Sequence, residues 1–299
     1  MDILTIKDLH KSFGDKEVLS GLELSVAEGS IFGFIGKNGS GKTTTMKAIL
    51  GLVKADAGEI FVAGERVAYG QTPTNRFVGY LPDVPQFYPF MTSREYLMLC
   101  GESLGMSRGD IIKRSEELLS LVGLADERHR IKGFSRGMKQ RLGIAQALLG
   151  SPKLLICDEP TSALDPVGRK EILDILLAVK GRTTVLFSTH ILSDVERICT
   201  DVALLDGGKI AMQGPIDQLK RTRRKEEFSV EMSDRAGVEG LAEKFADARL
   251  SDGDTLVFDG GEERMYEVLD FIRLNSLSLR KIEKLEGSLE TLFMEVVGK

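Results

Sequence analysis

A glycine-rich segment reads Gly36-Lys37-Asn38-Gly39-Ser40-Gly41-Lys42-Thr43, which fits the pattern GxxxxGK[ST]. The residues just before it, 31–35, are almost all apolar, as in a strand that is covered on both faces of a sheet. The apolar residues after it recur at helical spacing, at Met46, Ile49, Leu50 and Val53. A buried strand, a glycine-rich turn and a helix in this order predict a phosphate-binding loop.

The chemistry of such a loop depends on its backbone and on two side chains. Glycines let successive N–H groups point at phosphate oxygens, and the start of the helix adds unpaired N–H groups and the positive end of its dipole. Lys42 is placed to bridge the β- and γ-phosphates, and the Thr43 hydroxyl to ligate Mg²⁺. A merely glycine-rich turn is the alternative, which the flanking strand and helix disfavour. We expect the phosphates of a nucleoside triphosphate to contact Gly36, Lys37, Asn38, Gly39, Ser40, Gly41, Lys42, Thr43 and Thr44.

A second apolar strand supplies the carboxylates that phosphoryl transfer needs. It reads Leu154-Leu155-Ile156-Cys157-Asp158-Glu159. Asp158 is expected to hold Mg²⁺ through a water, and Glu159 to act on the attacking water. Apolar strands often end in acids simply because they reach solvent, so this strand gains its meaning from the phosphate loop.

The rest of the chain predicts an α/β fold. Residues 4–26 alternate apolar and polar positions, which is typical of antiparallel strands with one buried face. Residues 92–132 are helical in pattern, and Thr92 with Glu95 makes a capping box. From residue 154 onward short strands alternate with helices, one of which has Asp165-Pro166 at its start. We therefore predict a mostly parallel sheet with helices on both faces, an N-terminal antiparallel subdomain and a helical insertion.

The basic run Arg221-Thr222-Arg223-Arg224-Lys225 suggests a domain boundary. A solvated linker or helix end explains it better than a lipid- or nucleic-acid-binding patch does. Beyond it the pattern reads strand, helix, two strands, helix, strand and a last helix at 288–297, which is compatible with a ferredoxin-like appendage. We predict one domain over 1–220, with a helical subdomain at about 88–150, and a small α+β accessory domain over 226–299.

Composition narrows the function classes. The chain has 299 residues, a net charge of −5 and a pI near 5.5, which argues against a protein that coats nucleic acid. Cys100, Cys157 and Cys199 lack metal-binding spacing and are expected to be reduced thiols. We find no signal-peptide pattern and no apolar run near the roughly 18 residues that span a bilayer. Any role at a membrane is therefore expected from the aqueous side.

Three further segments give a specific resemblance. The run Phe134-Ser135-Arg136-Gly137-Met138-Lys139-Gln140-Arg141 resembles the signature motif of ABC ATPases, commonly written LSGGQ. Ser162-Ala163-Leu164-Asp165 is similar to the D-loop of that family, and Ser188-Thr189-His190 to its switch histidine. With the phosphate loop and the acidic strand, five elements follow the family's order over about residues 1–217.

The resemblance implies a P-loop NTPase core that works as a pair. Ser135 and Gly137 open a helix, and they are expected to close onto the γ-phosphate held by the loop of another chain. His190 is expected to contact the γ-phosphate and to position Glu159 and water. Phe13 lies where the family places an aromatic ring that stacks on adenine, with core packing as the alternative. Glu159, His190 and Lys42 are the residues implied to be catalytic.

The sequence departs from the family pattern at several places. Asp83 stands where the family has a glutamine that senses the γ-phosphate and metal; it can ligate Mg²⁺ but cannot donate an amide hydrogen bond, and Gln86 is a spare candidate. In the signature, Arg136 replaces the first glycine and Met138 the glutamine. Such FSxGM variants, and the tail at residues 287–293, resemble ABC-2-type exporters, which include multidrug and antibiotic pumps.

This resemblance implies partners and a location. It implies an ATP-binding subunit that uses ATP and Mg²⁺, pairs as a homodimer or with a paralogous subunit, and powers export through a membrane-spanning permease on a separate chain. The expected location is the cytoplasmic face of the membrane, as a peripheral subunit, with no nucleic-acid partner. A loop with Phe87, Tyr88, Phe90 and Met91 is expected either to dock that permease or to pack at a domain seam.

Two other functions compete with a transporter subunit. A soluble ABC ATPase of DNA repair carries long coiled coils between phosphate loop and signature, and residues 43–134 show none; one of translation carries two nucleotide domains in tandem. A regulator that senses nucleotide without hydrolysing it tends to lack the water-activating acid, and Glu159 argues against it.

Overall fold

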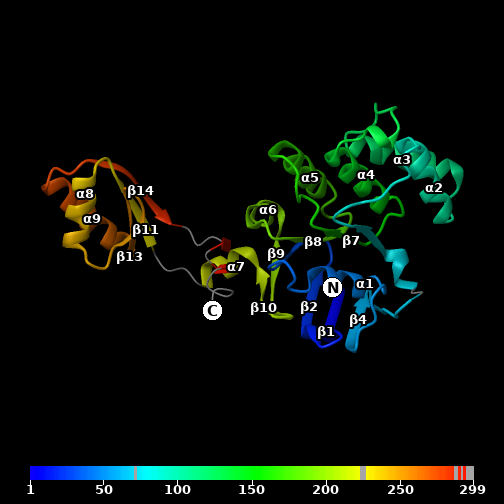
Figure 1. Ribbon diagram of the computed structural model, residues 1–299, viewed down its shortest axis with the longest axis horizontal. Helices are drawn as coiled ribbons and strands as arrows, with labels where there is room; N and C mark the ends of the chain where they lie inside the picture. The colour runs from blue at the N-terminus through cyan, green and yellow to red at the C-terminus, as the bar shows by residue number, and fades with distance from the viewer. Residues whose placement is uncertain (71–72, 223–226, 286–288, 291, 294–299) are drawn as a thin grey trace. The chain divides into compact units, whose positions relative to one another are not determined.

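The computed structural model describes residues 1–70, 73–222, 227–285, 289–290 and 292–293 (Figure 1). The chain divides into two compact units, Met1–Ile216 and Asp217–Lys299. In the described part of the chain, every helix is too short or too polar to cross a bilayer.

The first unit is built on a six-stranded sheet with the strand order β10-β9-β3-β8-β7-β6. All neighbouring strands in it are parallel except β10 and β9. The central strands β3, β7 and β8 are buried along their whole length, because both faces of the sheet are covered. This confirms the predicted parallel sheet. The strands are β3 (Ile31–Ile35), β6 (Val78–Leu81), β7 (Leu154–Asp158), β8 (Thr184–Thr189), β9 (Asp201–Asp206) and β10 (Lys209–Pro215).

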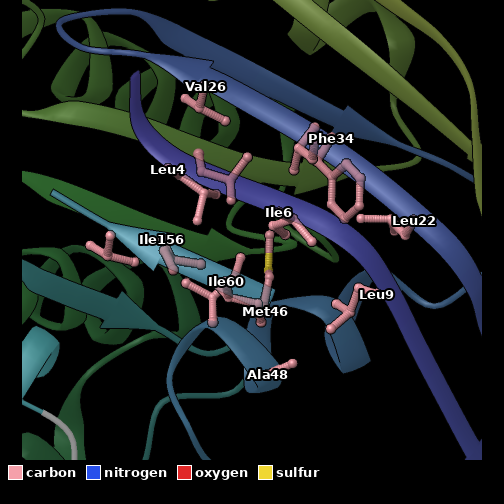
Figure 2. Close-up of a cluster of buried hydrophobic side chains, with 14 of the residues drawn as sticks. Leu4, Ile6, Leu9, Leu22, Val26, Phe34, Met46, Ala48, Ile60 and Ile156 are labelled. Atoms are coloured by element: carbon pink, nitrogen blue, oxygen red, sulfur yellow. The ribbon is translucent and has the colours of Figure 1, made fainter. Parts of the chain in front are cut away.

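A separate antiparallel sheet, in the order β2-β1-β4-β5, covers one face of the parallel sheet. Its strands are β1 (Asp2–Phe13), β2 (Lys16–Ala27), β4 (Ala57–Val62) and β5 (Glu65–Arg66). Figure 2 shows Leu4 and Ile6 of β1 pointing into the same core as Phe34 of β3 and Met46. The alternating apolar residues of the N-terminal strands thus form the face that the sequence pattern predicts.

Helix α1 (Lys42–Ile49) follows the glycine-rich loop and packs into that core. It is shorter than the apolar spacing to Val53 predicts. The chain turns at Gly51, whose φ is 67°, and the N–H groups of Leu52 and Val53 donate to the Lys47 carbonyl, which ends the helix.

The opposite face of the parallel sheet is covered by α6 (Leu192–Ile198). A Cβ on Gly33 of β3 would stand 2.7 Å from Val195 Cγ1, so this helix approaches the strand as closely as a glycine allows. Helices therefore lie on both faces of the sheet, as predicted.

The helical insertion contains α2 (Ser93–Ser103) and α3 (Arg108–Leu121), which group with α4 (Arg136–Leu148) (Figure 1). Thr92 and Glu95 form the predicted capping box, and Ser107 caps α3. Asp165 caps α5 (Pro166–Ala178) through the N–H of Gly168. Short 3₁₀ turns lie at Pro73–Phe77 and Ile131–Gly133. The helix α7 (Ile216–Thr222) begins at the last residue of the first unit and continues into the second.

The second unit has four antiparallel strands in the order β12-β13-β11-β14, with two helices between them in sequence. The order of these elements along the chain is βαββαβ, which is compatible with the predicted ferredoxin-like unit. Its core contains Phe228 and Phe258, which stack with ring centroids 5.1 Å apart. Residues 223–225 of the basic run lie outside the described residues, and so does most of the helix expected at 288–297. The elements are β11 (Glu227–Met232), α8 (Arg235–Lys244), β12 (Arg249–Asp252), β13 (Thr255–Asp259), α9 (Glu262–Leu274) and β14 (Leu279–Leu285).

Candidate functional site

Four adjacent strands end at one edge of the parallel sheet, and each leads into a predicted site residue. β3 leads into the glycine-rich loop at Gly36, β7 into Glu159, β8 into His190 and β6 into the loop with Asp83. Ligands of open α/β sheets bind at the carboxyl ends of the strands. The topology therefore collects these residues at one edge, although more than 100 residues separate some of them.

The glycine-rich loop wraps around the ammonium group of Lys42. Gly41, at φ 114°, takes a conformation that disfavours any side chain, and it is the N-cap residue of α1. Lys42 is only 6% exposed, and its Nζ donates to the carbonyl oxygens of Gly36 at 2.7 Å and Lys37 at 3.3 Å. Within the described chain, Ser40 Oγ is buried without a hydrogen-bond partner, so the loop holds a polar group that a ligand can satisfy. A buried cation beside a helix start fits a phosphate group.

A cavity of about 390 Å³ lies beside this loop. Phe13 at its rim is 53% exposed, which contradicts the alternative that its ring packs in the core. Lys11 Nζ lies 5.1 Å from the centre of that ring. Lys16 and Val18 also line the cavity, and sequence reasoning missed them. They are two positions apart on β2, so their side chains lie on the same face of that strand, which is the sequence signal that could have identified them. The lining residues are Phe13, Lys16, Val18, Asn38, Gly39, Gly41, Lys42, Thr43, Thr44 and Glu159.

Asp158 is held by two hydroxyl groups at the inner end of the site. It is 4% exposed; Thr43 Oγ1 donates to its Oδ2 at 2.8 Å and Ser188 Oγ to its Oδ1 at 2.7 Å. The part played by Ser188 was not foreseen. The described residues contain no cluster of three or more His, Cys, Asp or Glu side chains that could hold a metal. One carboxylate and one hydroxyl are the protein ligands that suit Mg²⁺ when phosphates complete its shell.

Glu159 sits between the loop lysine and the predicted switch histidine. Its Oε2 lies 2.9 Å from His190 Nδ1, and its Oε1 lies 3.5 Å from Lys42 Nζ. Its backbone has φ 48°, a conformation that is uncommon outside glycine and often found at functional sites. The N–H of Glu159 donates to Ser188 Oγ at 3.0 Å, which supports this conformation. A carboxylate oriented in this way can accept a proton from a bound water.

The signature residues face a different cavity. Ser135 is exposed and caps α4 by accepting from the Met138 N–H at 3.2 Å. Ser135 and Gly137 line a cavity of about 330 Å³ together with Ala163, Leu164 and Asp165 of the D-loop. Met138 is half-buried and lines this cavity as well. Within one chain, the signature therefore shares a cavity with the D-loop, while the phosphate loop lines a different cavity.

Asp83 contacts the signature and the D-loop in this chain. Its Oδ1 accepts from Ser162 Oγ at 2.5 Å and lies 3.4 Å from Arg136 Nη2. Gln86, the spare candidate for the sensor role, is exposed.

The sequence did not predict a buried hydrogen-bond network next to the acidic strand. Asp194 of α6 is 4% exposed; it accepts from Thr161 Oγ1 at 2.8 Å and from Arg169 Nη2 at 2.7 Å. It ties the turn after Glu159 to the helix that follows His190. Asp194 lies four residues before the buried Ile198, and a charge on the apolar face of a helix was the available signal.

A glycine-rich loop around a buried lysine, a buried aspartate bonded to the threonine of that loop, and an oriented glutamate meet at one sheet edge. These are the features of a P-loop nucleoside triphosphatase. Comparisons with known proteins narrow this class. Residues 19–162 match the family model described as ABC transporter. The chain is 35% identical to the ABC transporter ATP-binding protein YxlF of Bacillus subtilis, over 99% of both chains. It is 37% identical to the bacitracin transport ATP-binding protein BcrA of Bacillus licheniformis, over 99% of this chain and 97% of that one.

A solved structure of an ATP-binding subunit of an ABC transporter has a TM-score of 0.65 and 34% identity, over 74% of this chain and 92% of the other. The chain therefore belongs to the family of ABC transporter ATP-binding proteins. It is the ATP-binding subunit of such a transporter, and it hydrolyses ATP.

Proposed function

We propose that two nucleotide-binding chains, either two copies of this chain or this chain and a paralogue, close face to face on ATP and drive export through a separate membrane-spanning permease. The observation that carries this proposal is the separation of the two phosphate-binding ends. Lys42 and Ser135 line different cavities of one chain, so each can serve the same phosphate only across a pair. ATP bound between two chains favours the pair, and hydrolysis releases it.

Within the pair we assign the roles from the contacts of each side chain. Lys42 and the loop amides hold the β- and γ-phosphates, and Phe13 offers its exposed ring to adenine. Glu159 accepts a proton from the attacking water, and His190 holds the Glu159 carboxylate while meeting the γ-phosphate. Thr43 and Asp158 would hold Mg²⁺, which supplies charge neutralisation at the phosphates. Ser135 and Gly137 of the second chain bind the γ-phosphate from its other side.

We infer that the permease docks on exposed aromatic side chains of the loop after β6. Tyr88 is 52% and Phe90 is 60% exposed, which supports docking by these two residues. Phe87 instead meets the buried Tyr96 edge-on at 5.0 Å, which supports a packing role. Replacing Tyr88 and Phe90 with alanine should weaken capture of the permease. Phe87→Ala should lower the melting temperature and leave capture of the permease largely unchanged. Unchanged capture by the Tyr88 and Phe90 variant would contradict this docking site.

The direction and the cargo are inferred from resemblance. The FSxGM signature and the similarity to a bacitracin transport protein support outward transport of an antibiotic-like compound. The ATPase domain is proposed to span residues 1–220, with its helical subdomain at about 88–150, and the accessory domain residues 226–299. We propose that the chain works at the membrane as a peripheral subunit on the cytoplasmic face.

Glu159→Gln tests the enzymatic part of the proposal. The variant keeps the size and hydrogen-bonding shape of the side chain but removes the base, so hydrolysis should fall by about 10²–10⁴-fold. ATP binding should persist, and ATP should hold two chains together in size-exclusion chromatography. Turnover at the rate of the unmodified protein would exclude Glu159 as the base.

Affinity capture from native membranes tests the partnership. We expect a polytopic membrane protein to co-purify with the chain. Recovery of DNA or ribosomes in its place would favour the soluble ABC ATPases of repair or translation.

A further inference from the structure

Two loops and the start of the signature helix meet at one partly exposed cluster of side chains. Asp83 belongs to the loop after β6, Arg136 is the first residue of α4, and Ser162 follows the acidic strand β7. Asp83 Oδ1 accepts from Ser162 Oγ at 2.5 Å, and Arg136 Nη2 lies 3.4 Å from Asp83 Oδ1 and 3.3 Å from Ser162 Oγ. Each of the three side chains thus contacts the other two.

The loop of Asp83 is also anchored from the inside. Gln140 is fully buried, and its Nε2 donates to the backbone carbonyl of Asp83 at 2.8 Å. Gln140 and Arg136 are four residues apart, so they lie on one face of α4. The same helix therefore contacts this loop at two points, through the buried side-chain amide of Gln140 and through the exposed guanidinium of Arg136.

Two departures of this chain from the family pattern come together here. Asp83 stands in the place of a glutamine and Arg136 in the place of a glycine. A cation is disfavoured at a helix N-terminus and a carboxylate is favoured there, because that end of the helix dipole is positive. The carboxylate of Asp83 therefore offsets the arginine that α4 carries in its first turn. Removing either side chain would leave the charge of the other one uncompensated.

The cluster reaches both halves of the reaction. Arg136 directly follows Ser135, the signature residue that we propose to bind the γ-phosphate of the other chain. The backbone N–H of Ser162 donates to the Glu159 carbonyl at 3.0 Å. A shift of the cluster would therefore move the signature helix relative to the acid that activates water.

From these contacts we propose that Asp83, Arg136 and Ser162 form a clasp that sets the signature helix against the D-loop, with Asp83 and Arg136 as positioning residues for ATP hydrolysis. The proposal rests on the proposed function of a paired ATPase. It assigns the Asp83 carboxylate to Arg136 and Ser162 instead of to Mg²⁺. Both charged side chains are about half exposed, at 48% and 46%, so their interaction is screened by salt.

The test is a double-mutant cycle on the full chain with Asp83→Ala, Arg136→Ala and the combined variant. Each is assayed for kcat and KM of ATP hydrolysis and, separately, for ATP affinity by equilibrium binding with a fluorescent ATP analogue. We expect each single change to lower kcat by about two- to fivefold and to leave ATP affinity unchanged, since the phosphate loop is intact. The combined variant should be no slower than the slower single variant, because each change already breaks the same clasp.

Two further measurements separate positioning from a general loss of structure. At 1 M salt, where exposed charges are screened, the coupling between the two changes should fall toward onefold. Exchange of the charges, Asp83→Arg with Arg136→Asp, should recover part of the lost kcat. Single variants with unaltered kcat, or effects that multiply in the combined variant, would overturn the clasp.

Lys42→Ala, run in parallel, keeps the two proposals apart. If it abolishes hydrolysis while the cycle shows no coupling, only the clasp is wrong. If hydrolysis survives Lys42→Ala, the proposed function and the clasp are both wrong.

Discussion

The two proposed phosphate-binding ends of the ATPase unit differ in how much of each is complete within one chain. At the glycine-rich loop, Lys42 is buried and contacts Gly36, Lys37 and Glu159. At the signature, Ser135 is exposed and its hydroxyl caps its own helix. The first end is preorganised before a second chain arrives. The second end presents its groups outward, as the proposed binding of a phosphate from a partner chain requires.

Lys42→Ala breaks the preorganised end and should have the largest effect. Removing one fixed positive group from the developing phosphate charge should lower kcat by about 10²–10³-fold. Steady-state ATP hydrolysis is the measurement. Lys47→Ala is the matched control, because Lys47 is an exposed residue of the same helix α1. A Lys42 variant as active as the Lys47 variant would remove the distinction between a complete and an incomplete end.

Ser135→Ala tests the outward-facing end. Loss of a hydrogen bond to a charged phosphate costs about 1.5–3 kcal/mol, which weakens ATP-dependent pairing by roughly 10–100-fold. Analytical ultracentrifugation in the Glu159→Gln background measures this pairing, while ATP binding to the single chain should stay unchanged.

Ser107→Ala is the matched control for this variant. Ser107 caps α3 just as Ser135 caps α4, each accepting from a backbone N–H at 3.2 Å. Both variants should lose about 1 kcal/mol of stability as a lost helix cap. Only Ser135→Ala should weaken pairing, and equal pairing by the two variants would mean that Ser135 is a helix cap and nothing more.

Asp194→Ala sharpens the contrast between buried and exposed contacts. It leaves the fully buried Thr161 hydroxyl without its acceptor, which should lower the free energy of unfolding by about 1–3 kcal/mol. Asp83→Ala removes a half-exposed pair and should cost less than about 1 kcal/mol. Urea denaturation of both variants gives the comparison. If Asp83→Ala lowered the free energy of unfolding more than Asp194→Ala, the exposed contact and not the buried one would be the more stabilising.

The sequence predicted those parts of the site that lie in short, local motifs. The phosphate loop and the strand ending in Asp158 combine a periodic apolar run with residues of defined chemistry, so both their structure and their place could be inferred. The capping box at Thr92 and the cap at Asp165 are equally local, because each joins residues three positions apart.

Contacts between distant segments could not be predicted in this way. Asp83 meets Ser162 across 79 residues, and Thr161 meets Asp194 across 33, and no local pattern marks either pair. The end of α1 was misjudged for a different reason, since the apolar spacing to Val53 continues past the turn that Gly51 makes. Periodicity reports which residues are buried, and a loop residue can be buried at helical spacing.

Mixing two inactive variants tests directly whether the phosphate is gripped by two chains. Lys42→Ala lacks a working phosphate loop and Ser135→Arg lacks a working signature, so neither should pair on ATP or hydrolyse it alone. A mixed pair contains one intact site, made from the loop of the Ser135 variant and the signature of the Lys42 variant. We predict that equal mixing restores ATP-dependent pairing and part of the hydrolysis. A mixture as inactive as its components would contradict a paired site made from two copies of this chain.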